Sequence, residues 1–141
     1  MVVKFKKLSE QAIIPKYDCI GDAGLTMTAI SKEFNINRHI EYGTGIAVEI
    51  PEGYVGLLFS RSSICTKALS MSNCVGVIDS GYRGEIKFKF TWLDCIYGDI
   101  YQVGDKIGQL IIIPYPQIEL EECEELSKTE RGEGGFGHTG K

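Results

Sequence analysis

The chain has 141 residues, a formal net charge of −4, 43% hydrophobic residues and 24% charged residues. These values are typical of one globular domain with a hydrophobic core, and they exclude a disordered chain and a membrane protein. The acidic balance argues against direct binding of nucleic acid, which usually requires a basic surface. The sequence has no apolar run of the roughly 20 residues needed to span a bilayer and no secretory signal pattern, so we expect a cytoplasmic protein without membrane contact.

The five cysteines are scattered along the chain, and no Cys-x-x-Cys pair suggests a zinc site or a redox motif. We therefore expect reduced thiols in a cytosol-like compartment. The two histidines, His39 and His138, stand far apart in the sequence and are too few to build a metal site.

Between the 17 glycines, the sequence follows the two-residue period of β-strands rather than the 3.6-residue period of helices. Short helices are possible only at residues 31–34 and 62–71. Strands are predicted at residues 44–50, 54–60, 85–92, 109–113 and 117–122, with a turn at 51–53. The clearest strand is 85–92, in which Ile86, Phe88, Phe90 and Trp92 alternate with polar residues. Many short strands and little helix indicate an all-β sandwich, jelly roll or small barrel.

The composition changes after about residue 125, where the chain becomes rich in glycine. We expect residues 1–126 to form the β core and residues 127–141 to form a flexible arm, because a glycine-rich stretch cannot fold alone. Arg131 and Lys141 suit a phosphate ligand, and Phe136 offers a face for a nucleobase. On these residues alone, a disordered solubilising tail is equally consistent with the pattern.

Two further motifs carry side chains that suit phosphate chemistry. Arg61 and the adjacent serines follow an apolar strand, where a guanidinium and hydroxyls can hold a di- or triphosphate, although a surface turn is the commoner explanation. Asp79 stands in a turn, where an aspartate ordinarily bonds its own backbone. Alternatively, its carboxylate acts as a general base for phosphoanhydride hydrolysis, with Mg²⁺ held by the substrate phosphates.

Five blocks of the sequence, taken in order, resemble the trimeric all-β dUTP pyrophosphatases (dUTPases). The blocks are residues 22–27, 61–63, 73–84, 108–114 and 131–140, and together they span nearly the whole chain. The resemblance implies a jelly-roll-like subunit of the β-clip type, a homotrimer with sites completed by neighbouring chains, and an arm that closes over the nucleotide. It also implies Mg²⁺-assisted hydrolysis of dUTP to dUMP and pyrophosphate, which keeps uracil out of DNA and supplies dUMP.

The same resemblance implies roles for individual residues. Asp79 activates the water that attacks the α-phosphorus, and Tyr82 packs under the deoxyribose. The uracil pocket is lined by Asn73, Gly76, Val77, Ile78 and Lys87. The phosphates are held from the core by Arg61, Ser62, Ser63 and Gln109. The arm contributes Arg131, Phe136, Gly137, His138 and Thr139, with the phenylalanine stacked on the base.

The first block departs from the family pattern, which reads Ala-Gly-x-Asp-Leu. Residues 23–27 read Ala-Gly-Leu-Thr-Met, so Thr26 replaces the aspartate linked to the metal's water shell. A hydroxyl cannot replace that charge, and Asp22 would have to be redirected to compensate. The resemblance then implies that the substrate phosphates hold most of the metal, and we expect altered metal dependence or reduced turnover with binding retained. Two alternatives stay open: a dUTP-binding regulatory protein with weakened catalysis, and a relative of the dCTP deaminases.

Overall fold

The computed structural model describes residues 1–36, 38–93 and 98–136, which form ten strands and one short 3₁₀ helix, η1 (Ser62–Thr66). The strands are β1 (Lys4–Lys7), β2 (Leu25–Thr28), β3 (Ser31–Asn35), β4 (His39–Gly43), β5 (Ile46–Glu49), β6 (Tyr54–Ser60), β7 (Leu69–Met71), β8 (Gly76–Ile78), β9 (Lys87–Trp92) and β10 (Lys106–Pro114). This confirms the all-β fold class expected from the sequence. Among the described residues, no helix is long and apolar enough to cross a membrane.

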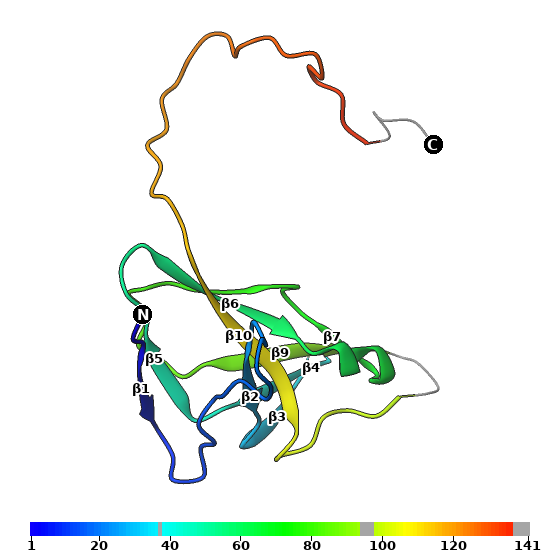
Figure 1. Cartoon of the computed structure of the whole chain (residues 1–141). Helices are drawn as coiled ribbons and strands as arrows, with labels where there is room; N and C mark the ends of the chain where they lie inside the picture. The colour runs from blue at the N-terminus through cyan, green and yellow to red at the C-terminus, as the bar shows by residue number, and fades with distance from the viewer. Residues whose placement is uncertain (37, 94–97, 137–141) are drawn as a thin grey trace.

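Two four-stranded antiparallel sheets make up most of the structure (Figure 1). One sheet has the strand order β2-β10-β6-β8, and the other has the order β3-β4-β9-β7. Strands β1 and β5 form a separate two-stranded sheet. Strand β6 pairs with both β8 and β10, so it links the segment around Asp79 to the segment around Gln109.

Apolar side chains from both large sheets form one core. In β9, Phe88 and Phe90 have no exposed surface, whereas Lys87 and Lys89, which alternate with them, face solvent. The two phenylalanine rings stack with their centroids 6.3 Å apart, and Tyr42 meets Phe90 edge to face. The alternation in this strand therefore places every second residue in the core, as its sequence pattern predicted.

Several strand predictions are confirmed, with shifts at the ends. Strand β6 has the predicted bounds, and β5, β9 and β10 overlap the predicted strands at 44–50, 85–92 and 109–113. Trp92 is 48% exposed because the strand ends there, so the buried alternation stops at Phe90.

Of three further local predictions, two were wrong, and the short helix expected within 62–71 was confirmed only for residues 62–66. Residues 31–34 belong to strand β3, whose partner β4 supplies the backbone hydrogen bonds that a short helix would have had to make internally. Residues 62–71 begin as η1 but end in β7, which pairs with β9. Residues 117–122 contain no strand, although their sequence alternates between apolar and acidic residues.

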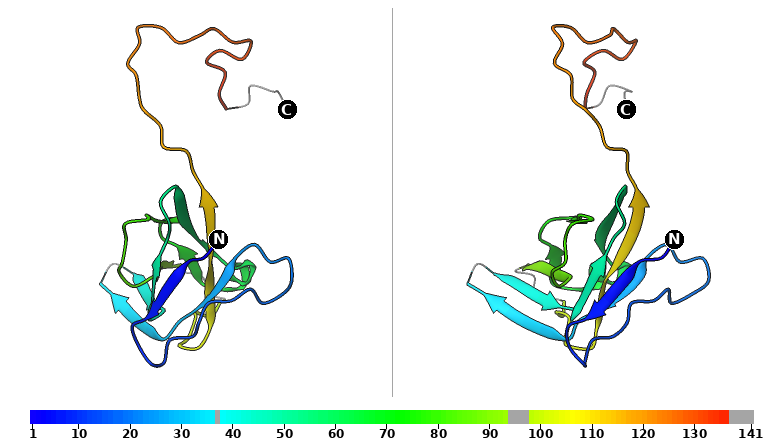
Figure 2. Two further views of the ribbon diagram at one scale, coloured as in Figure 1. Left: turned by 60° about the vertical axis from the view of Figure 1, so that its left-hand side comes forward. Right: turned by 90° about the vertical axis from the view of Figure 1, so that its left-hand side faces the viewer.

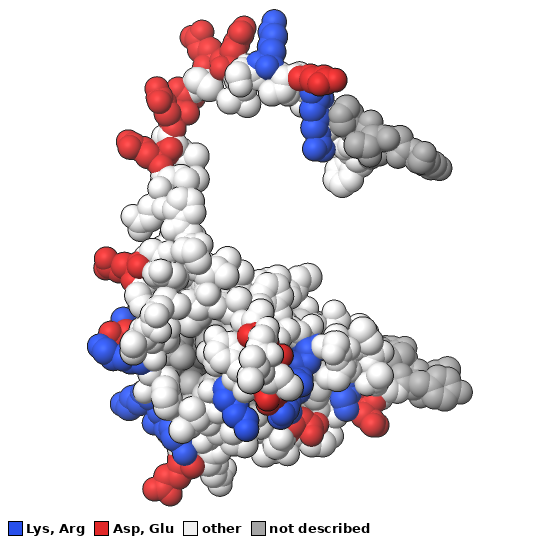
Figure 3. All heavy atoms as spheres, viewed as in Figure 1, with Lys and Arg blue, Asp and Glu red and all other residues white. Residues whose placement is uncertain are grey.

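The described chain beyond Pro114 leaves the sheets and runs outward, as the three views of the ribbon agree (Figures 1 and 2). Nearly all its residues are exposed. Acidic side chains follow the first part of this segment, and basic side chains lie nearer its end (Figure 3).

Candidate active site

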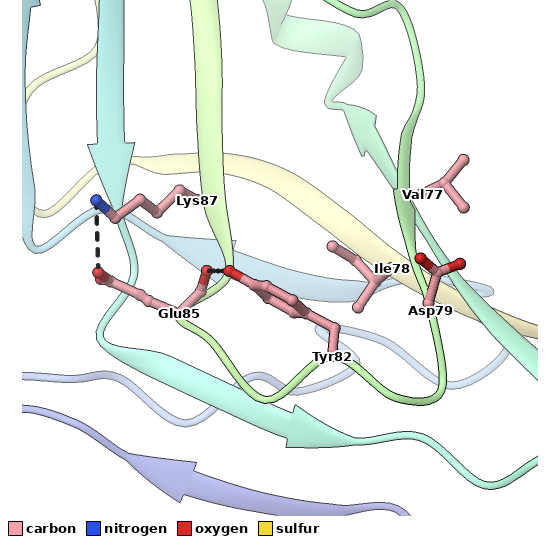
Figure 4. A pocket seen from close by; sticks show the side chains of 6 residues that line it. All are labelled: Val77, Ile78, Asp79, Tyr82, Glu85 and Lys87. Atoms are coloured by element: carbon pink, nitrogen blue, oxygen red, sulfur yellow. Dashed lines mark hydrogen bonds and ion pairs between the residues drawn. The ribbon is translucent and has the colours of Figure 1, made fainter.

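A cavity of about 220 Å³ lies beside the loop that joins β8 to β9. We call it the hairpin cavity after this loop, although β8 and β9 belong to different sheets. It is lined by Val77, Ile78, Asp79, Tyr82, Glu85 and Lys87. Figure 4 shows Ile78 between Asp79 and the Tyr82 ring, with Glu85 and Lys87 at the far end of that ring. Five of these residues were expected to form the site. Asp79 was expected to be the general base, Tyr82 the sugar contact, and Val77, Ile78 and Lys87 part of the uracil pocket.

Polar contacts fix one end of the hairpin cavity. The Tyr82 hydroxyl donates to the Glu85 carbonyl oxygen at 3.0 Å, so the ring has a defined orientation. The Lys87 ammonium donates to Glu41 at 2.8 Å. This hydrogen bond raises the pKa of Lys87 and lowers the pKa of Glu41. Lys87 is therefore a charged ammonium group at the cavity, and its ion pair with Glu41 fixes the position of that group.

Glu85 was not among the residues predicted to form the site. Its carboxylate accepts the backbone N–H of Gly45 at 2.7 Å, which ties the end of the β8–β9 loop to the turn before β5. No local sequence pattern indicated this role, because Gly45 lies 40 residues away along the chain.

A second cavity, of about 360 Å³, lies where the loop before β2 meets the end of β6, and we call it the loop cavity. It is lined by Asp18, Cys19, Asp22, Ala23, Gly24, Thr26, Arg61, Ser62 and Gln109. Three predicted phosphate-binding residues therefore share this cavity with the residues of the first block. Asp18 lies before that block and was not predicted.

Close packing explains the glycine at position 24. A Cβ atom on Gly24 would lie 2.5 Å from Oε1 and 2.9 Å from Cβ of Gln109. The side-chain amide of Gln109 donates to the Ser60 carbonyl oxygen at 3.4 Å. Gly24 thus lets the first block approach the Gln109 side chain where β10 pairs with the end of β6.

Other predicted residues lie outside the two cavities. The Ser63 hydroxyl contacts the Tyr101 hydroxyl at 3.4 Å, and Asn73 is exposed in the turn before β8. Gly76 is buried in β8 opposite Leu58. In the C-terminal segment, Arg131 donates to the Gly134 carbonyl oxygen at 2.9 Å, and Phe136 is fully exposed. Gly137, His138 and Thr139 lie outside the described residues.

The two cavities have no lining residue in common within the described chain. Ile78 pairs with Gly56 near the start of β6, whereas Arg61 follows the end of that strand. Because β8 runs antiparallel to β6, Asp79 lies still farther from Arg61. At about 3.3 Å per residue, the strand separates Asp79 from Arg61 by roughly 15–20 Å.

The fold and cavities define an all-β protein in which cations, hydroxyls and carboxylates gather in two separate polar cavities. The cations and hydroxyls among these groups can bind an anionic ligand. A family model described as dUTPase matches residues 10–140, and the chain therefore belongs to the dUTPase family. This confirms the resemblance drawn from the five sequence blocks.

Similar proteins support the same family over nearly the full chain. A protein of Finegoldia magna named deoxyuridine 5'-triphosphate nucleotidohydrolase is 41% identical, with 90% of this chain and 91% of that protein covered. A protein of the same name from Fusobacterium nucleatum is 40% identical, with 99% of this chain and 98% of that protein covered.

Solved structures of phage dUTPases share the fold. The Staphylococcus bacteriophage 80alpha dUTPase with dUPNHPP has a TM-score of 0.83 and 31% identity, with 99% of this chain and 98% of that chain covered. A mutant dUTPase of phage phi11 of S. aureus, described with a structural Mg(II) ion, has a TM-score of 0.75 and 29% identity. The match to the phi11 protein covers 89% of this chain and 98% of that one.

Proposed function

We propose that this protein hydrolyses dUTP to dUMP and pyrophosphate by attack of water on the α-phosphorus. The observation that carries the proposal is the hairpin cavity of a dUTPase-family chain, where Asp79 and Tyr82 lie together. The reaction would keep uracil out of DNA and supply dUMP. The names of the bacterial relatives and the nucleotide analogue in the phage structure support this substrate.

In this mechanism, Asp79 is the general base. Its carboxylate accepts a proton from the attacking water, so the water must bind within about 2.6–3.2 Å of that carboxylate. The Tyr82 ring, oriented by its hydrogen bond to Glu85, packs under the deoxyribose and excludes a 2'-hydroxyl. Uracil binds against the β8 segment and its surroundings, formed by Asn73, Gly76, Val77, Ile78 and Lys87.

The phosphates bind to the loop cavity and the arm. The guanidinium of Arg61 is suited to a bidentate contact with phosphate oxygens, and Gln109 adds a neutral donor. From the core, the phosphate set is Arg61, Ser62, Ser63 and Gln109. From the arm, it is Arg131, Gly137, His138 and Thr139, while Phe136 stacks on the base. The arm, residues 127–141, closes over the nucleotide and excludes water from the phosphates.

The active metal is Mg²⁺, held mainly by the substrate phosphates. The loop cavity fits this ion in its chemistry, because its hydroxyl, amide and carboxylate oxygens are the hard donors that Mg²⁺ and its bound waters prefer. Among residues 1–36, 38–93 and 98–136, no three His, Cys, Asp or Glu side chains gather to hold a metal. When bound, Mg²⁺ spreads the negative charge that develops on the phosphates.

A complete site requires more than one chain. The backbone positions of Arg61 and Asp79 in one chain lie roughly 15–20 Å apart, so we infer that the two side chains of one chain do not meet at the same α-phosphate. We therefore propose a homotrimer in which the hairpin cavity of one chain faces the loop cavity of another.

We further propose a cytoplasmic enzyme without membrane or nucleic-acid contact, consistent with the net charge of −4 and the exposed free thiols at Cys19, Cys65, Cys74 and Cys123.

The first experiment measures the products formed from dUTP, dTTP, dCTP and UTP in the presence of Mg²⁺. We expect pyrophosphate and dUMP from dUTP and little product from the others. Asp79→Asn should lower kcat by about 100- to 10,000-fold while a non-hydrolysable dUTP analogue still binds. Glu52→Gln, which removes an exposed carboxylate from the turn before β6, is the matched control and should leave kcat unchanged.

Two outcomes would replace the proposal by one of the alternatives. Tight dUTP binding without any pyrophosphate would indicate a dUTP-binding regulatory protein. Release of ammonia from dCTP would indicate a dCTP deaminase.

A further inference from the structure

Asp18 lies between two cations at the loop cavity. One carboxylate oxygen, Oδ2, accepts hydrogen bonds from the Thr26 hydroxyl at 2.9 Å and from Nη1 of Arg61 at 3.3 Å. The other oxygen, Oδ1, accepts from the Lys106 ammonium at 2.9 Å. Arg61 also donates to the Thr26 hydroxyl at 2.8 Å, so Asp18, Thr26 and Arg61 form a closed triangle.

This cluster joins three regions that are distant in sequence, since only Asp18 and Thr26 lie near each other along the chain. Asp18 comes from the loop before β2, and Thr26 comes from β2 itself. Arg61 follows β6, and Lys106 begins β10. The side chains of Asp18 and Arg61 are only 22% and 31% exposed, so solvent reaches this pair less than it reaches the Lys4–Glu49 pair on the surface.

The electrostatics keep Asp18 charged. The hydrogen bond from Lys106, followed by those from Thr26 and Arg61, lowers the pKa of Asp18 to about 2. An arginine side chain has several rotatable bonds, and holding it in one geometry before the ligand arrives reduces the entropy lost on binding. The triangle restrains Arg61 in this way through Nη1, so Nε and Nη2 are the groups that would donate to an anion in the cavity.

We propose that Asp18 is a positioning residue for triphosphate binding: together with Thr26, it holds the Arg61 guanidinium at the loop cavity. The proposal rests on the dUTPase function proposed above and adds a residue that the sequence blocks do not contain. It also revises the expectation that Thr26 leaves this site without a negative charge. The charge comes from position 18, and Thr26 links it to Arg61.

The other aspartate of the loop has a different partner. Asp22 accepts the backbone N–H of Cys19 at 2.9 Å, so its carboxylate stabilises the turn of the loop. Because the Thr26 hydroxyl lies 2.8 Å from the guanidinium, an aspartate introduced at position 26 would place a carboxylate where Asp18 now places one. This geometry makes it possible to move the charge from one residue to the other.

The test therefore compares Asp18→Asn, Thr26→Asp and the double variant with the wild type. Calorimetry measures the Kd of three ligands: non-hydrolysable dUTP analogue, inorganic tripolyphosphate and deoxyuridine. We expect Asp18→Asn to raise the Kd of both phosphate ligands about tenfold and to change that of deoxyuridine less than about twofold. Adding Thr26→Asp to Asp18→Asn should restore both phosphate affinities to within about threefold of wild type.

Glu49→Gln is the matched control, because it breaks a lysine–carboxylate contact of 3.0 Å away from both cavities. It should leave all three Kd values unchanged. Repeating the series in EDTA, which removes the metal, shows whether the Asp18 carboxylate acts through Arg61 or through Mg²⁺. The loss in Asp18→Asn should persist without metal, because Asp18 acts through Arg61.

Each contrary result would overturn the proposal. Tighter phosphate binding by Asp18→Asn would show that the carboxylate competes with phosphate for Arg61. A loss of phosphate affinity that disappears in EDTA would show that the Asp18 carboxylate acts through the metal. Failure of Thr26→Asp to restore binding in the double variant would show that the triangle is only structural. If the wild type binds tripolyphosphate but not the dUTP analogue, the dUTPase proposal fails, and the tripolyphosphate series alone decides the role of Asp18.

Discussion

Gly108 lies at the point where β10 crosses the core, and an added methyl group there would collide with Phe88. A Cβ atom at this position would overlap the Phe88 ring, 2.5 Å from Cζ and 2.8 Å from Cδ1. Carbon atoms in contact normally lie about 3.5–4.0 Å apart. Phe88 has no exposed surface and stacks on Phe90, so the ring cannot move without displacing the core.

Gly108→Ala should therefore lower the free energy of unfolding by about 3 kcal/mol, at the upper end of the usual cost of overpacking. Replacing the ring with a smaller side chain should make room for the methyl group. Phe88→Leu alone should cost about 1–2 kcal/mol. The double variant should cost at least about 1 kcal/mol less than the sum of the two single variants.

Guanidinium-induced unfolding, followed by circular dichroism at one fixed protein concentration, measures these differences. Gly81→Ala is the control, because a Cβ atom there would meet nothing within 4 Å. Its cost should stay within about 0.5 kcal/mol. Additive costs for Gly108→Ala and Phe88→Leu would show instead that the methyl group does not press on this ring.

Three further predictions follow from the same structure. Tyr42→Phe should lower the free energy of unfolding by about 1–3 kcal/mol, because the buried hydroxyl donates to the Tyr101 carbonyl oxygen at 2.9 Å; an unchanged denaturation midpoint would contradict this. The pKa of Asp18, about 2, lies below its ordinary value of 3.8, so its stabilising effect is complete above about pH 4 and is lost as the pH falls toward 2. Unfolding midpoints measured across that range should fall more steeply for the wild type than for Asp18→Asn. Deleting residues 127–141 should sharply lower kcat/KM in a pyrophosphate assay and change the free energy of unfolding by less than about 0.5 kcal/mol, whereas full activity would exclude a closing arm.

The sequence predicted those strands in which buried apolar residues alternate with exposed polar residues. Strand β9 is an example, because Phe88 and Phe90 are buried and the lysines that alternate with them are not. Residues 117–122 have a similar alternation but no strand partner in the described chain, and a strand needs a neighbour to pair with its backbone. Residues 31–34 form a strand only because β4 pairs with them, a partnership that a short local pattern does not reveal.

For the candidate site, the sequence likewise identified the residues but not how they are arranged in space. The sequence blocks identified Asp79, Tyr82 and Arg61, whose residue types suit the proposed chemistry. They did not indicate that Asp79 and Arg61 lie in separate cavities, because that separation follows from the pairing register of β6 with β8. They also missed Asp18, because its contacts with Arg61 and Lys106 span 43 and 88 residues of sequence and leave no local pattern.

We propose that dUTP is hydrolysed at a site built from the hairpin cavity of one chain and the loop cavity of another. Asp79→Asn disables the first cavity and Arg61→Ala the second, so each pure variant should lack activity. Exchange of subunits in a 1:1 mixture should place an intact hairpin cavity beside an intact loop cavity in about a quarter of the sites. The measurement is pyrophosphate release from dUTP by this mixture, with subunit exchange verified by mass spectrometry. We predict about a quarter of the wild-type rate, and a fully exchanged mixture that stays inactive would contradict the account.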